Sequence, residues 1–453
     1  MSRFGRSFAL AACAALITCL PAPATAEPAD SGCSSGRSLR YVVVFDPGTT
    51  EPEARGQTEA ACGTATAYYP EIAVGVATST DHAFVTRFGP ARAFSAQAQR
   101  RGGTPSRDRL SQTDPAGVSS VNRADEQWDM DAIDARAAGP GRRDVVVGVL
   151  DSGVDPGHPD LAGTVDPQAS AGCLSGAPDR QWTPTTSAHG TQVAGIVAAH
   201  DDGKGVTGVA PGVRVASVKV IDDRGYVTPE AAVCGLMWAA AHHMRVANAS
   251  FAVDPWGVSC AHGADYGVVY EAMTRAVRYA NSAGTLVVAA ATNEAVNLTP
   301  ARSTTSSEST CDVLPAGLRD VVTASAVGRG GVKAGYSSYG LGVVDLAAPG
   351  GSGDDCVLST VPDGYGSMCG TSMAAPHVSG VAALVASAHP EFGPRQLRTA
   401  LARGARPMPC PTDYDLTGDG RQDAFCAGYT GYNGFYGHGM VDAAGALAAA
   451  RGE

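Results

Sequence analysis

From residue 144 onward, continuous apolar runs alternate with longer segments of helical pattern. Residues 145–150 are apolar without a break, which is typical of a parallel strand buried on both faces. Further strands are expected at 213–221, 246–250, 285–291 and 321–327, and helices at 189–199, 228–243, 265–282 and 372–388. This succession predicts an α/β fold, in which helices flank both faces of a parallel β-sheet.

The first 26 residues have the pattern of a secretory signal peptide. Arg3 and Arg6 precede an apolar run at 8–20, and small residues lead to a cleavage point after Ala26. The run is short for a membrane span, and no second run is long and uncharged enough to be one. We therefore expect a secreted, extracellular protein. The alternative is a lipid anchor at Cys19, within a segment that resembles a lipoprotein box.

Two more segments precede the α/β region. Residues 27–90 read as a small α+β unit, with strands expected at 40–45 and 72–76. Residues 91–124 are largely Arg, Gly, Ser, Gln and Pro, which is typical of an exposed linker that a protease can cut. The remaining residues, 125–453, are assigned to the main domain.

The charge of the chain excludes some classes of partner. Acidic residues outnumber basic ones by 44 to 33, the net charge is −11, and no block of Lys or Arg occurs. Such a chain is repelled by nucleic acid and by anionic membrane surfaces. We therefore expect no nucleic acid among its partners. A monomer is a separate expectation that the charge does not test.

Cysteine usage fits an oxidising compartment. Of the 12 cysteines, Cys13 and Cys19 fall within the expected signal peptide, so an even number remains, and no Cys-x-x-Cys pair occurs. Disulfides are therefore favoured over a zinc site, although the spacing leaves the full connectivity open. The pairs that we expect first are Cys33–Cys62, Cys356–Cys369 and Cys410–Cys426.

Three polar residues stand where an α/β fold gathers functional groups. Asp151 follows the first buried strand, at the sheet edge where ligands and catalytic groups collect. His189 begins a helix in which Gly190 and Gly195 leave room for close backbone approach. Ser372 also begins a helix, where unpaired N–H groups favour negative charge and so suit a nucleophile that builds an oxyanion. Each residue alone is also compatible with a turn or capping role.

Taken together, in the order Asp, His, Ser, these segments resemble the subtilisin-like serine protease family, the subtilases. The resemblance covers about residues 127–446. It implies a serine endopeptidase in which His189 is the general base, Ser372 the nucleophile, and Asp151 the residue that fixes the imidazole tautomer. By the same resemblance, protein or peptide substrates are cleaved through an acyl-enzyme intermediate, which water then hydrolyses to free the acyl product. The other matching segments are 158–161, 205–211, 336–340, 346–350 and 437–441.

The resemblance also implies further site residues and needs no cofactor for the chemistry. Asn293 matches the residue whose amide stabilises the oxyanion. Thr292 stands where the family usually has Gly, and Ser-Phe-Ala replaces Ser-Leu-Gly in the substrate-binding wall. Both changes add bulk, so we expect a preference for small or medium apolar residues before the scissile bond. The wall residues are Ser250, Phe251 and Ala252.

The unit at 27–90 resembles the family's inhibitory propeptide. By that resemblance it assists folding, blocks the cleft as an intramolecular inhibitor, and is removed by self-cleavage within 91–124.

A structural calcium site is a separate expectation. Residues 415–423 resemble the first nine positions of a calcium loop, with Asp415, Asp419 and Asp423 as ligands and Gly420 at the sharp turn. The final bidentate Glu of such a loop is absent. The alternative is a solvated acidic turn tied by the expected disulfide Cys410–Cys426.

Two other classes of function fit parts of the sequence. Residues 32–36 match the G-x-S-x-G motif of lipase-like hydrolases, but no strand precedes the motif and no helix follows it. A noncatalytic binding protein on the protease fold is disfavoured because all four catalytic positions are intact. Acid-acting relatives, which use Glu and Asp beside Ser, are disfavoured by His189.

Overall fold

The computed structural model describes residues 32–99, 121–260, 263–300 and 311–452 in full, and residues 109–114 by their backbone. The expected signal peptide and the alternative anchor at Cys19 lie outside the described residues. No helix in the described part of the chain combines the length and apolarity that a bilayer crossing needs.

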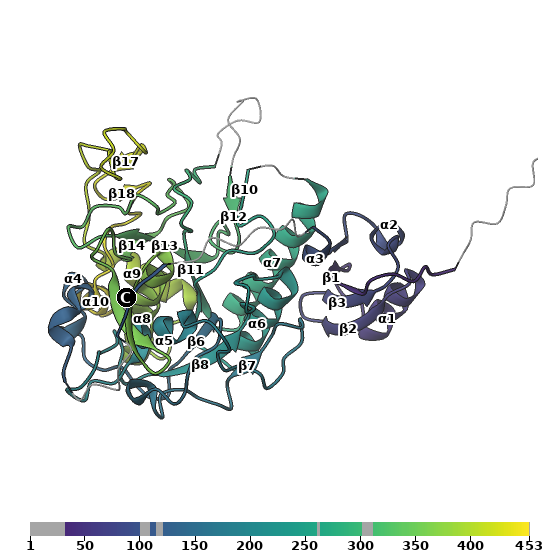
Figure 1. The fold of residues 1–453 in the computed structure, drawn as a ribbon, viewed down its shortest axis with the longest axis horizontal. Helices are drawn as coiled ribbons and strands as arrows, with labels where there is room; N and C mark the ends of the chain where they lie inside the picture. Colours follow the sequence, from purple (N-terminus) through teal and green to yellow (C-terminus); the bar gives the residue numbers. More distant parts are fainter. Residues whose placement is uncertain (1–31, 100–108, 115–120, 261–262, 301–310, 453) are drawn as a thin grey trace, which may run out of the picture.

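A seven-stranded sheet forms the centre of the main domain, in the order β14-β13-β11-β9-β6-β8-β7, and all neighbouring pairs are parallel (Figure 1). This confirms the predicted α/β fold. The strands are β6 (Val146–Asp151), β7 (Ala171–Gly172), β8 (Arg214–Lys219), β9 (Val246–Ala249), β11 (Leu286–Ala290), β13 (Val321–Val327) and β14 (Leu346–Pro349).

Helices cover both faces of this sheet. Along β6, Val147 and Val149 join the core under α5 and α8, whereas Val146 and Leu150 join the core under α6 and α7. Because both faces of the sheet are buried, residues that point to either face are apolar. The strand is therefore one continuous apolar run in the sequence. The helices are α4 (Trp128–Ala132), α5 (His189–Ala198), α6 (Pro229–Ala241), α7 (Ala264–Ser282), α8 (Thr371–Ala388), α9 (Pro394–Gly404) and α10 (Ala443–Ala450).

The N-terminal unit, described over residues 32–99, contains a four-stranded antiparallel sheet in the order β2-β3-β1-β4. It lies against α6 and α7 (Figure 1). Its sheet runs past residue 90, because the last strand pairs with β1. The elements are β1 (Leu39–Val44), α1 (Glu51–Ala60), β2 (Thr64–Tyr69), β3 (Val74–Ser79), α2 (Phe84–Phe88), β4 (Ala93–Phe94) and α3 (Ala96–Gln99).

A second small sheet leads to Ser372. The hairpin of β15 (Val357–Val361) and β16 (Gly364–Cys369) ends three residues before it. The backbone of β5 (Arg109–Asp114), within the predicted linker, pairs antiparallel with β16. Part of the linker is therefore a strand beside the segment that carries the nucleophile candidate. The remaining elements are η1 (Ala124–Glu126), η2 (Ala135–Ala137), η3 (Pro159–Leu161), β10 (Val258–Ser259), β12 (Asp312–Val313), β17 (Gly428–Tyr429) and β18 (Tyr432–Asn433).

Five disulfides are present among the described residues. The three pairs expected from the sequence, Cys33–Cys62, Cys356–Cys369 and Cys410–Cys426, are confirmed. The other two bonds, which the spacing left open, are Cys173–Cys234 and Cys260–Cys311.

Candidate active site

An Asp–His pair lies at the carboxyl edge of the central sheet. β6 ends at Asp151 and α5 begins at His189. The Nδ1 atom of His189 lies 2.8 Å from Oδ1 and 2.9 Å from Oδ2 of Asp151. Since a carboxylate only accepts hydrogen bonds, the ring hydrogen belongs on Nδ1, and Nε2 is the nitrogen that can take a proton.

Close packing brings the two residues together. Asp151 is fully buried, whereas the His189 side chain keeps 16% of its exposure. A Cβ atom at Gly190 would collide with the carbonyl oxygen of Gly153 and touch the Asp151 side chain. Glycine at position 190 therefore lets the start of α5 approach the end of β6, as the sequence predicts.

Ser372 is the second residue of α8, and its side chain is buried. The carbonyl oxygen of Ser372 accepts a hydrogen bond of 2.8 Å from Oγ of Ser250. Pro376 lies four residues further along the helix and has no N–H to offer that carbonyl. The Ser250 hydroxyl therefore replaces the missing helix bond at the residue that would act as nucleophile.

Asn293 lies next to the start of α8. Its Oδ1 atom accepts hydrogen bonds of 2.9 Å from the backbone nitrogen and from Oγ1 of Thr371. Thr371 directly precedes Ser372, so this amide is fixed beside the helix start where backbone N–H groups gather.

One cleft of about 770 Å³ gathers these residues. Ser372, His189 and Asn293 line it, and Asp151 is connected to it through His189. The predicted wall also lines it, with Ser250, Phe251, Ala252 and Thr292. The arrangement places an imidazole, a hydroxyl and an amide around a space large enough for a peptide segment, with a buried carboxylate behind the imidazole.

Thr292 has a strained backbone. Its φ is +79°, a left-handed conformation that β-branched residues rarely adopt. Its hydroxyl donates a 2.9 Å hydrogen bond to Oγ of Ser338, whose backbone nitrogen bonds back to the Thr292 carbonyl at 3.0 Å. These bonds hold the side chain in the cleft at the position where the family usually has Gly.

Sequence reasoning missed several residues of the cleft. Two loops, after β8 and after β9, contribute acidic and aromatic side chains to its wall. Loop residues carry no periodic signal, so only knowledge of the sheet order places them in the same cleft as Ser372. The missed residues are Asp222, Asp223, Tyr226, Asp254 and Trp256.

The predicted calcium ligands come together in a different part of the chain. One carboxylate oxygen each from Asp415, Asp419 and Asp423 lie within 4.8 Å of one another. The Asp415 oxygens also accept hydrogen bonds from the backbone nitrogens of Gly418 and Gly420, at 2.8 and 2.9 Å. Oxygen donors at this spacing fit a hard cation such as Ca²⁺, and calcium binding stays an expectation.

The N-terminal unit contacts the main domain through apolar and polar groups. Val42, Val44 and Phe94 belong to the core that α6 and α7 share with the central sheet. Phe94 stacks on Trp256 of the cleft wall, with ring centroids 5.1 Å apart. From α7, Nη1 of Arg275 donates hydrogen bonds to the carbonyls of Phe45 and Ile72, at 2.9 and 3.1 Å.

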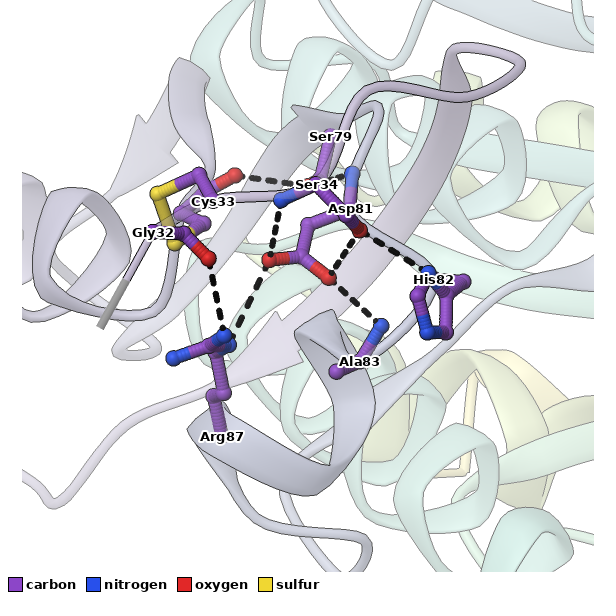
Figure 2. Close-up of a disulfide and its surroundings, with 9 residues drawn as sticks. Gly32, Cys33, Ser34, Ser79, Asp81, His82, Ala83 and Arg87 are labelled. Carbon is purple, nitrogen blue, oxygen red and sulfur yellow. Dashed lines mark hydrogen bonds and ion pairs between the residues drawn. A yellow bond between two sulfur atoms is a disulfide. The ribbon is translucent and has the colours of Figure 1, made fainter. Parts of the chain in front are cut away.

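The serine of the G-x-S-x-G match lies in a different arrangement (Figure 2). The Oγ atom of Ser34 is 2.8 Å from Nδ1 of His82 and 3.0 Å from Oδ1 of Asp81. The carboxylate thus bonds the serine, whereas in a catalytic relay it bonds the far nitrogen of the imidazole. Arg87 and the Ala83 N–H also contact Asp81, so this cluster fastens the chain beside the disulfide Cys33–Cys62.

Comparison with known proteins identifies the family. Residues 142–439 match the subtilase family, which is more than half of the chain. The chain belongs to the subtilase family. The match begins just before β6 and ends beyond Ser372, so it contains the whole Asp–His–Ser arrangement.

Individual relatives agree with this assignment. Subtilisin NAT of Bacillus subtilis subsp. natto is 36% identical over 259 residues, which cover 57% of this subtilase and 59% of the relative. The match therefore spans less than two thirds of that relative's length. A solved protease structure from Pseudoalteromonas arctica PAMC 21717 is 30% identical, with a TM-score of 0.55, and covers 74% of this subtilase and 99% of that chain.

A second solved structure extends the similarity in fold. The epidermin leader peptide processing serine protease of Staphylococcus aureus has a TM-score of 0.66 at 21% identity. The superposition covers 91% of this subtilase and 98% of that chain.

Proposed function

We propose that this subtilase is a secreted, monomeric serine endopeptidase that hydrolyses peptide bonds in proteins through an acyl-enzyme intermediate. The observation that carries the proposal is the buried Asp151–His189 pair beside the cleft that Ser372 and Asn293 line. Family membership and five disulfides, which suit an oxidising compartment, support the proposal.

The mechanism uses groups of the protein alone. Nε2 of His189 takes the proton of the Ser372 hydroxyl as its oxygen attacks the peptide carbonyl. Asp151 holds Nδ1–H and stabilises the imidazolium that forms. The amide of Asn293 and the backbone N–H of Ser372 stabilise the oxyanion, and the imidazolium then protonates the leaving amine. Water, activated by His189, releases the acyl group from Ser372.

We propose further that the N-terminal unit is an intramolecular inhibitor, removed by cleavage within residues 91–124. The unit shares a core with α6 and α7, and Phe94 stacks on Trp256 at the cleft wall. Such contacts hold the unit against the domain, next to the wall of the cleft.

Casein hydrolysis by the secreted protein tests both proposals, with wild type compared with Ser372→Ala. We expect the wild type to digest casein and to begin, by N-terminal sequencing, within residues 91–124. The variant should be inactive and keep its N-terminal unit. A Ser372→Ala protein that matures and digests equally well would show that Ser372 is not the nucleophile. A wild type that is folded but inactive would favour a noncatalytic binding protein.

A further inference from the structure

A second Asp–His pair lies outside the cleft. Asp129 belongs to α4 and His377 to α8, and both side chains are fully buried. Oδ2 of Asp129 lies 3.0 Å from Nε2 of His377. On the other side of the ring, Nδ1 lies 2.7 Å from the carbonyl oxygen of Met373, the residue that follows Ser372.

The two contacts restrict where the protons of this pair can lie. A carbonyl oxygen only accepts, so Nδ1 of His377 must carry a hydrogen. If the carboxylate of Asp129 were ionised and Nε2 bare, two lone pairs would face each other at 3.0 Å. The contact therefore contains a proton, held either by Nε2 or by the Asp129 carboxyl group. In both arrangements the orientation of the His377 ring is fixed by a hydrogen bond at each of its nitrogens.

Stability alone explains this pair poorly. The second oxygen of Asp129, Oδ1, is buried and lacks a hydrogen-bond partner among the described residues. An unsatisfied buried oxygen costs free energy, and buried ion pairs are often matched or surpassed in stability by apolar side chains of similar size. A polar pair with this cost calls for a positional role.

The hydrogen bonds of the first turn of α8 indicate that role. Because Pro376 has no N–H, the Ser372 carbonyl is held by the Ser250 hydroxyl, at 2.8 Å. The next carbonyl along the chain, that of Met373, accepts from the His377 ring. Two side chains thus fix the two successive peptide groups that follow the nucleophile candidate.

Asp129 connects this turn to the first helix of the main domain. α4 starts at Trp128, a few residues after the segment in which cleavage is proposed. The indole Nε1 of Trp128 contacts the carbonyl of Cys356 at 3.5 Å, in the disulfide Cys356–Cys369 that bridges the β15–β16 hairpin. α4 therefore contacts α8 through His377, and it contacts Cys356, which a disulfide bonds to Cys369 in the segment that leads to Ser372.

We infer that Asp129 is a positioning residue: by holding the His377 ring against the Met373 carbonyl, it sets the placement of Ser372 in the proposed reaction. The inference rests on the proposed peptidase function. Small displacements of a reacting group lower the rate of the chemical step far more than they weaken substrate binding. The signature of the role is therefore a fall in kcat at nearly constant KM.

The test compares Asp129→Leu, Asp129→Ser and Asp129→Asn with wild type and with Asp131→Ala. Asp131 lies on the same helix but is exposed, so its variant controls for a change in α4 itself. Asn keeps the contact, because its Nδ2 can donate to Nε2 while Nδ1–H stays on Met373. Leu and Ser remove it. The measurements are kcat and KM on a chromogenic peptide, and the melting temperature of each protein.

We expect Asp129→Leu and Asp129→Ser to lower kcat about 10- to 100-fold with KM near the wild-type value. Asp129→Asn and Asp131→Ala should keep most of the wild-type kcat. The inference is overturned if Leu or Ser lowers the melting temperature but leaves kcat unchanged, or if Asn loses as much kcat as Leu.

It is also overturned if neither Leu nor Ser gives folded enzyme while Asn does, since the pair would then serve folding alone. Failure of the proposed function is a separate result, because it would appear as an inactive wild type, or as a Ser372→Ala variant equal to it.

Discussion

Asn293 is oriented by the residue that precedes Ser372. Both the backbone nitrogen and Oγ1 of Thr371 lie 2.9 Å from Oδ1 of Asn293. A backbone N–H only donates, so the atom that faces Thr371 is the amide oxygen, and Nδ2 is the other branch of the same planar group. The donor proposed for the oxyanion is thus preorganised before substrate binds.

Replacing Asn293 should therefore affect the chemical step. We expect Asn293→Ala to lower kcat about 100- to 1000-fold with little change in KM, because the lost hydrogen bond forms fully only in the transition state. Steady-state kinetics on a chromogenic peptide measures this. Asn293→Asp is the matched variant: it can still accept from Thr371 but places a negative charge by the oxyanion, so it should be no faster than Ala. A large rise in KM at unchanged kcat would contradict the assignment.

The strands could be predicted from sequence where burial on both faces makes every residue of the strand apolar. Val146 and Val147 point to opposite faces of β6, yet both are buried, so the run at 145–150 is apolar throughout. β7 has two residues and β14 has four, which is too short for such a run to stand out.

Contacts between distant segments could not be predicted. No local pattern indicates that residues 109–114 pair with β16, because the partners are more than 200 residues apart. Motifs along the chain were enough to predict Asp151, His189 and Ser372 as site residues. They did not indicate that Trp256 lies in the cleft wall, or that Asp129 lies beside His377, because these contacts also join distant segments. Nearby cysteines paired as expected, whereas Cys173–Cys234 depends on the tertiary fold.

Thr292→Gly should widen the choice of substrate. The left-handed φ of +79° is easily adopted by Gly, and the change removes a branched side chain from the cleft wall. We expect cleavage after Phe, relative to cleavage after Ala, to rise about tenfold in kcat/KM with matched peptides. Ser338→Ala is the control, since it removes the hydrogen bond to Thr292 without shortening that side chain. Equal shifts in both variants would mean that the hydrogen bond, not bulk, sets the preference.

Lys333 should make the free energy of unfolding depend on pH in the alkaline range. Its amino group is buried and donates to the carbonyls of Ala334 and Ser337, at 2.8 and 2.6 Å. Burial lowers the pKa of Lys333 from 10.5 to about 8. Between pH 8 and 10.5 the Lys333 amino group is protonated in the unfolded chain but neutral in the folded protein. The free energy of unfolding therefore rises with pH over this range, by about 3 kcal/mol from this group.

Lys333→Met lacks this titration. Its free energy of unfolding, relative to that of the wild type, should therefore fall between pH 8 and 10.5. Urea unfolding at several pH values measures the difference, in a Ser372→Ala background that prevents self-digestion. Parallel pH profiles for the two proteins would show that Lys333 does not change its charge in this range.

The disulfide Cys33–Cys62 should hold the N-terminal unit together. It joins cysteines 29 residues apart in a unit too small for a large core (Figure 2). Loop-closure entropy predicts a loss of about 3–4 kcal/mol on replacing both cysteines by Ser. Hydrogen exchange of the full chain, in the Ser372→Ala background, should speed up in β1 and β3 but not in β11. The same replacement at Cys410–Cys426 should leave β1 and β3 unchanged; equal acceleration in both would indicate general destabilisation.

Calcium should stabilise the chain through the acidic loop. Carboxylate oxygens of Asp415, Asp419 and Asp423 within 4.8 Å repel one another, and a bound cation removes that repulsion. A ligand that binds only the folded state at a hundred times its Kd adds about 2.7 kcal/mol. EDTA should therefore lower the melting temperature, and added Ca²⁺ should restore it.

Asp419→Asn should lose this response to calcium, whereas Asp354→Asn, at an exposed aspartate outside the loop, should keep it. If the wild type melts at the same temperature with EDTA and with Ca²⁺, the loop is a solvated turn. Its shape would then be set by the hydrogen bonds of Asp415 to the nitrogens of Gly418 and Gly420, and by the disulfide Cys410–Cys426. Those bonds need no metal, so Asp415→Ala would lower the melting temperature in either case, and only the response to calcium separates the two.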